Sequence, residues 1–91
     1  MFFHGKLGDT VSFNYRHSAS GRFERRVVRV VVVVDNRKRY VLQEDGSVES
    51  ATTDNADRIG GYVVSEGPTT FKSFRLDRVI GKVRLVKRTI M

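Results

Sequence analysis

The five consecutive valines at 30–34 constrain this chain more than any other feature. Valine is branched at Cβ, which restricts its χ1 and suits it to a pleated surface, so the run favours a strand over a helix. An unbroken apolar run also implies burial on both faces for part of its length. In a small domain this occurs where a strand bends between packed sheets or lines a closed barrel. Residues 23–34 are therefore predicted to form one long strand.

Short apolar–polar alternations separated by turns cover most of the remaining chain, which is typical of further strands. They lie at 10–15, 40–42, 62–64, 69–75 and 79–90. Residues 47–58 are small, acidic and polar, and are predicted to be a loop or one short helix. The spacing predicts an all-β domain, a small barrel or sandwich of about five to six antiparallel strands.

The length of the chain, 91 residues, is that of one domain, so residues 1–91 are predicted to share one core. No run of about 18 apolar residues is present, and we expect no membrane span. The absence of cysteine excludes disulfides and thiolate metal sites. The N-terminus lacks the pattern of a secretion signal, and we expect a cytoplasmic protein.

Motifs that carry catalysis or hold a cofactor are absent from the sequence. His4 and His17 are the two histidines, and neither has Asp or Glu at metal-ligand spacing. The segment 5–10 contains glycine and lysine, but not in the order of a phosphate-binding loop. We therefore predict no enzyme activity, no metal site and no cofactor.

The charge of the chain indicates its class of partner. Lys and Arg number 17 against 10 Asp and Glu, which gives a net charge of +7. The acidic residues gather at 44–57, and the last block, 69–91, is strongly basic. A basic small domain suggests nucleic acid, a nucleotide-like anion or an acidic protein surface as partner. The alternative is a soluble protein that is basic without a specific anionic ligand.

Two stretches place arginines beside aromatic residues. In the segment 72–79 the Asp77 carboxylate lies close to Arg75 and Arg78, and an ion pair there would orient a guanidinium for a phosphate or carboxylate. An ordinary surface ion pair remains the alternative. In the second stretch, the aromatic residues at 13, 15 and 40 lie near the arginines at 25 and 26, which would suit a nucleobase and its phosphate. The alternative is that Phe13 and Tyr40 belong to the core and the arginines are solvated, and the alternation favours the core for Phe13.

The segment 72–79 resembles the closing motif of WYL domains, which runs Arg-Thr-Phe-Arg-Leu-Asp-Arg-Ile. The residues that match it directly are Phe74, Arg75, Leu76, Asp77 and Arg78. Upstream, Phe13-Asn14-Tyr15, Gly21 and Arg26 resemble the opening of that family. The Trp-Tyr-Leu signature itself aligns with Tyr40-Val41-Leu42, so only its leucine is kept.

This resemblance implies an SH3/Sm-like β-barrel with a ligand-sensing role in transcription regulators of bacteria and their phages, often for nucleic-acid or nucleotide ligands. The segment 45–68 would be an inserted acidic loop with an extra strand. By match to the motifs, Asp77 would orient an arginine. The ligand-facing residues would be Tyr15, Arg26, Tyr40, Arg75 and Arg78.

The sequence is consistent with three functions. The first is a WYL-like module that binds nucleic acid or an anionic nucleotide, as a regulator or as an accessory protein of a phage or mobile element in a bacterial cytoplasm. The second is an adaptor or phage-encoded inhibitor that docks on a host protein, where an exposed barrel edge could also pair with a second copy in a homodimer. The third is a structural or assembly protein of a virion.

Overall fold

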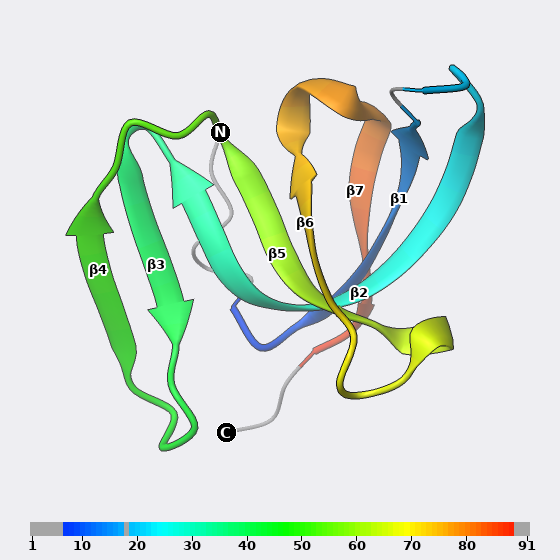
Figure 1. Ribbon diagram of the computed structural model, residues 1–91. Coiled ribbons are helices and arrows are strands. Elements are labelled where there is room, and N and C mark those ends of the chain that lie inside the picture. The colour runs from blue at the N-terminus through cyan, green and yellow to red at the C-terminus, as the bar shows by residue number, and fades with distance from the viewer. Residues whose placement is uncertain (1–6, 18, 89–91) are drawn as a thin grey trace.

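The computed structural model describes residues 7–17 and 19–88, which form an antiparallel β-structure (Figure 1). The all-β prediction is confirmed, with seven strands among these described residues in place of the expected five to six. Two short 3-10 helices, η2 (Val64–Glu66) and η3 (Leu76–Arg78), follow strands β5 and β6. The strands are β1 (Thr10–Arg16), β2 (Phe23–Asp35), β3 (Lys38–Leu42), β4 (Val48–Thr52), β5 (Arg58–Val63), β6 (Phe71–Arg75) and β7 (Val79–Lys87).

Strand β2 is the centre of the fold. One of its edges pairs with β1 along its first half and with β3 along its second half, while the other edge pairs with β5. Strand β7 pairs with β1, β6 pairs with β5, and η3 joins β6 to β7. This connectivity is that of an SH3-like barrel built from β1, β2, β5, β6 and β7, to which the β3–β4 hairpin is added.

The valine run marks the point where β2 curves between these partners (Figure 1). The pairing of β2 with β5 shifts register between Val30 and Val32, opposite Gly60 and Gly61. Such a bulge bends a strand and increases its twist. Val33 and Val34 are neighbours on opposite faces of the strand, and both are buried. The expected burial of this run on both faces is therefore confirmed.

The hydrophobic core lies between the β1–β2 pair and the β5–β6 pair. It consists of side chains that are at most 3% exposed: Val11, Phe13, Val28, Val30, Val33, Ile59, Val63 and Phe74. Half-buried residues of the loop before β1, of η3 and of β7 pack against this cluster, so the last strand closes one side of the core.

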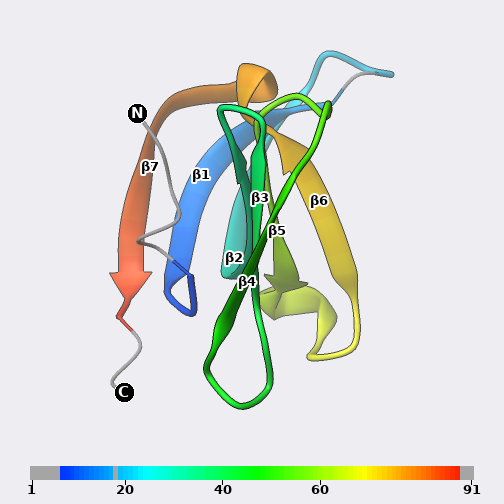
Figure 2. The same ribbon diagram turned by 90° about the vertical axis from the view of Figure 1, so that its left-hand side faces the viewer.

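The segment 45–68 differs from its prediction. The alternative of a short helix over 47–58 is wrong, because Val48–Thr52 forms β4, which pairs with β3 through the whole length of both strands. A turn at Gly46, with a φ of 88°, allows this tight return. The segment also contains β5 and so supplies two strands. The β3–β4 hairpin lies at the left of the other strands in Figure 1 and toward the viewer in Figure 2.

Two further predictions concern residues that the structure does not describe. The strand expected over 79–90 ends as β7 at Lys87, and residues 89 and 90 lie outside the described residues. His4 lies outside them as well. Within residues 7–17 and 19–88, no helix has the length and apolar character needed to cross a membrane.

Candidate nucleic-acid interface

Four residues of the predicted site meet around one buried ring, that of Phe74. The Tyr15 ring packs edge-on against Phe74 with 5.1 Å between centroids, and the Arg26 guanidinium carbon lies 5.8 Å from the Phe74 centroid. The Tyr15 hydroxyl accepts a 3.3 Å hydrogen bond from the backbone N–H of Arg75. Asp77 joins the group through Arg75. The structure therefore places these four residues together.

The charge of Arg26 is directed into the protein. Arg26 pairs in register with Phe13, which places it on the core face of β2, and its side chain is only 14% exposed. Its guanidinium reaches Glu24 at 2.9 Å and Glu66 at 3.2 Å. With both carboxylates paired to it, Arg26 closes the end of the barrel and has little capacity left for an external anion.

Glu66 is shared between two cations of this end of the barrel. Lys72 approaches its carboxylate to 2.9 Å, and Arg26 donates to it from β2. The hydrogen bond from Lys72 is the main cause that lowers the pKa of Glu66, and the positive charges of Lys72 and Arg26 lower it further. Glu66 is thus held ionised and ties η2 to β2 and β6.

Arg75 and Asp77 form the ion pair that the sequence predicted. Arg75 donates from Nε and Nη2 to the two carboxylate oxygens of Asp77, at 3.1 and 2.6 Å. This contact lowers the pKa of Asp77 and raises that of Arg75. A bidentate anion would need the same two donors, so Asp77 occupies the position that a phosphate would take.

Of the remaining two predicted residues, Arg78 lies beside the ion-paired group and Tyr40 lies apart from it. Arg78 is half-buried in η3, and its charge helps to lower the pKa of Asp77, but its side chain makes no hydrogen bond or ion pair with the described residues. Tyr40 lies on β3 opposite Val33, seven positions along β2 from Arg26. At about 3.3 Å per residue, that is a separation of roughly 23 Å along the strand. The structure does not bring Tyr40 to the other site residues.

A different group of cations lies on the outer face of β1, β2 and β7. Val11 and Phe13 point into the core, so the alternate residues of β1 point to the opposite face. Directly paired residues of antiparallel strands share a face. The register therefore aligns four rows across this face: Arg16–Phe23, Ile80–Asn14–Arg25, Arg84–Ser12–Val27 and Lys87–Thr10–Arg29.

We call the five cations of these rows the basic face: Arg16, Arg25, Arg29, Arg84 and Lys87. All five are exposed, and none of the positions in the four rows carries Asp or Glu. None of the five makes an ion pair or side-chain hydrogen bond within the part of the chain that the structure describes. The guanidinium of Arg16 lies over the Phe23 ring, 5.0 Å from its centroid.

Sequence reasoning missed the basic face as a group. Arg25 was noted only with Arg26, although the two neighbours point to opposite faces of β2. Arg84 and Lys87 become neighbours of β1 only through the β1–β7 pairing, which includes two register shifts. The alternation within residues 10–15 was the available signal, since it distinguishes core from outer positions, but it does not identify the partner strands.

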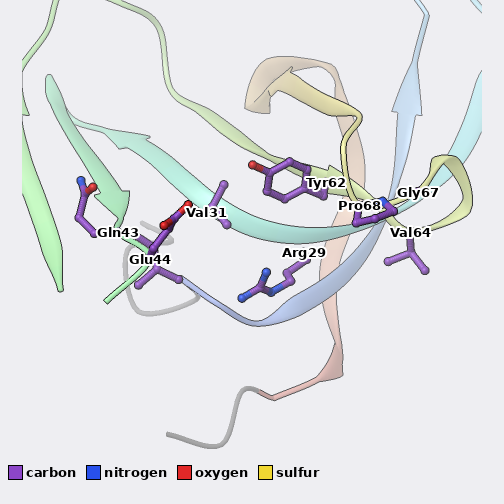
Figure 3. Close-up of a pocket in the computed structure, with 9 residues that line it drawn as sticks. Arg29, Val31, Gln43, Glu44, Tyr62, Val64, Gly67 and Pro68 are labelled. Carbon is purple, nitrogen blue, oxygen red and sulfur yellow. The ribbon is translucent and has the colours of Figure 1, made fainter. Parts of the chain in front are cut away.

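A groove of about 550 Å³ borders the basic face at Arg29 (Figure 3). Arg29 and Tyr62 are cross-strand partners, and the next partner across the sheet is Phe71. The rings of Tyr62 and Phe71 pack edge-on, 5.9 Å apart. The groove is lined by Arg29, Val31, Leu42, Gln43, Glu44, Tyr62, Val64, Gly67 and Pro68.

No cluster of His, Asp and Glu side chains suited to a metal ion occurs among residues 7–17 and 19–88. The chain was also compared with known proteins. No family model matches it, and neither a curated protein nor a solved structure does so.

Proposed function

We propose that this protein is a non-enzymatic nucleic-acid-binding module whose basic face contacts the phosphate backbone. The observation that supports this most directly is the alignment of five exposed, unpaired cations on three adjacent strands without a carboxylate among them. Phosphate contacts from Lys and Arg supply most of the affinity in non-specific binding and position the protein on its ligand.

Two polar residues that lie between these cations also suit this role. Thr10 and Asn14 are short polar side chains between the cations, and hydroxyl and amide groups bind phosphate and sugar oxygens. Phe23 stands next to Arg16 and is 56% exposed, so a ring is available for stacking at the end of this face.

The role of the WYL-like residues changes in this proposal. Arg26 joins β2 to η2 through Glu66, and Arg75 pairs with Asp77 two positions away, so both arginines leave anion binding to the outer face. A cytoplasmic setting in a bacterium, as a regulator or as an accessory protein of a phage or mobile element, remains part of the proposal. The WYL-like resemblance supports that setting.

The test is fluorescence anisotropy with labelled DNA and RNA between about 50 and 200 mM salt. If all five cations contact phosphates of a single strand, the slope of log affinity against log salt is about −3.5, a loss of roughly 100-fold over this range. The double variant Arg25→Ala/Arg84→Ala should flatten the slope by about 1.4.

A variant with the same loss of charge elsewhere provides the control. Lys38→Ala/Arg39→Ala removes two exposed cations from β3, which pairs with the opposite half of β2. It should lower affinity much less than Arg25→Ala/Arg84→Ala. Equal losses from both variants, or binding that does not respond to salt, would contradict the proposal.

A protein partner is the second candidate, and strand β7 favours it. Strand β7 pairs only with β1 among the described strands, so its other edge is open for an added strand. Ile80, Leu85 and Val86 on this strand are 41%, 42% and 52% exposed. A complex that is recovered from bacterial lysate after nuclease treatment, and that is lost in Val86→Lys, would support this candidate.

A further inference from the structure

The basic face and the groove form one continuous surface, and Arg29 belongs to both. Along the row that runs from Lys87 through Thr10 to Arg29, the next partners are Tyr62 on β5 and Phe71 on β6. This row crosses five adjacent strands, with cationic side chains on β7 and β2 and aromatic rings on β5 and β6. The same row offers donors for a phosphate and, a few ångströms further, a ring face for a base.

The Tyr62 ring lies beside the Phe71 ring, and Gly60 leaves space for Phe71. A Cβ atom at Gly60 would lie 2.8 Å from Cζ of Phe71, so the absence of a side chain there lets the Phe71 ring lie over β5. Phe71 in turn packs edge-on against Tyr62. The two rings thus lie together at the groove, where a base can stack.

The groove is chemically suited to a base rather than to a phosphate. Figure 3 shows Tyr62 and Val31 bordering it, with Gln43 and Glu44 together at the end away from Pro68. The apolar side chains provide stacking and contact area, and the Glu44 carboxylate repels a phosphate. The Glu44 carboxylate can bind the polar edge of a base, as can Oε1 of Gln43, whose Nε2 donates to Glu49 at 2.8 Å. A volume of about 550 Å³ falls in the range of small-ligand sites.

We propose that this groove receives an unpaired base of a single-stranded nucleic acid whose phosphates lie on the basic face. The inference rests on the proposed function and adds the form of the ligand. Arg29 would hold the phosphate next to the bound base, and Tyr62 would stack on the base. A duplex keeps its bases paired and stacked inside, so it can occupy the basic face but not the groove.

The first experiment uses the unaltered protein and four labelled probes of one length: single-stranded RNA, single-stranded DNA, duplex DNA and an abasic single strand. We expect both base-containing single strands to bind about tenfold or more tighter than the abasic strand, because one stacked base contributes that much. The two sugars share this chemistry, and the tighter of the two identifies the natural ligand. Equal affinity for the normal and abasic strands would overturn the inference.

The second experiment assigns the effect to Tyr62. Tyr62→Ala should reduce binding of the normal strand to the level of the abasic strand and leave abasic binding unchanged, whereas Tyr62→Phe should keep the preference. Thermal denaturation confirms that each variant is folded. If Tyr62→Ala does not fold, the comparison of probes with the unaltered protein still decides the question.

The outcomes separate this inference from the proposed function. If Arg25→Ala/Arg84→Ala abolishes binding while Tyr62→Ala has no effect on the preference for bases, the basic face is the interface and the groove inference is wrong. If no probe binds in a salt-dependent manner, the proposed function itself is wrong.

Discussion

Gly61 is the position where one added methyl group should disturb this fold most. Its Cβ would lie 1.9 Å from the backbone carbonyl oxygen of Arg29 and 2.9 Å from a methyl carbon of Val28. Ordinary contacts between carbon and oxygen begin at about 3.3 Å, so β2 and β5 would have to separate by more than 1 Å. The obstacle is backbone in the middle of a paired strand, which cannot rotate away.

The expected cost of Gly61→Ala follows from this geometry. Overpacking in a filled interior costs about 1–3 kcal/mol, and each hydrogen bond lost from the β2–β5 pairing adds about 0.5–1.5 kcal/mol. A domain of 91 residues has a stability of roughly 5–14 kcal/mol. We therefore expect a loss of at least about 2 kcal/mol and a fall in Tm of about 10 °C or more.

Gly60→Ala is the matched control, since it makes the same substitution at the neighbouring residue. Its Cβ would meet the far end of the Phe71 ring, and Phe71 is 48% exposed and can swing outward. Alanine in a strand is otherwise preferred over glycine by about 0.5–1 kcal/mol, so this variant should stay within about 1 kcal/mol of the parent. Urea denaturation followed by circular dichroism measures both. If Gly61→Ala is as stable as Gly60→Ala, the close approach of β2 to β5 is refuted.

Three further predictions concern the ion-paired end of the barrel. The lowered pKa of Glu66 means that its ionised form stabilises the fold above its ordinary pKa of 4.5, and that this contribution is lost as the pH falls through the lowered value. Glu66→Gln should therefore flatten the dependence of stability on pH in the acid range, as measured by denaturation at several pH values, and an unchanged profile would contradict it. Phe74→Ala removes a ring that is 3% exposed and should cost about 3–5 kcal/mol in the free energy of unfolding, whereas a loss below 1 kcal/mol would show that the ring is not central. Arg75→Ala/Arg78→Ala should lower nucleic-acid affinity no more than Lys38→Ala/Arg39→Ala, and a selective loss in anisotropy would return the binding site to the WYL-like motif.

Local features of the chain were sufficient to predict the strand class of most segments. The valine run became the bent central strand, because β-branched side chains and burial on both faces both act within a few residues. The ion pair of Arg75 with Asp77 was also predictable, since the two residues are two positions apart. The strand within residues 47–58 could not be predicted from the sequence. The short polar strand β4 depends on its pairing with β3 rather than on its own propensity.

The candidate site also has features that local sequence predicts and features that depend on strand pairing. The sequence by itself determined a small basic all-β domain and an ion pair at Arg75, which follow from composition, periodicity and near neighbours. The packing of Tyr15 against Phe74 joins residues far apart in the chain and came only from the tertiary structure. Only the tertiary structure decided that Arg26 turns inward to two carboxylates while Arg25 faces solvent. The physical reason is register: it joins residues distant in sequence, such as Arg84 and Arg25, on one face, and the shifts in the pairing that set it cannot be read from any one strand.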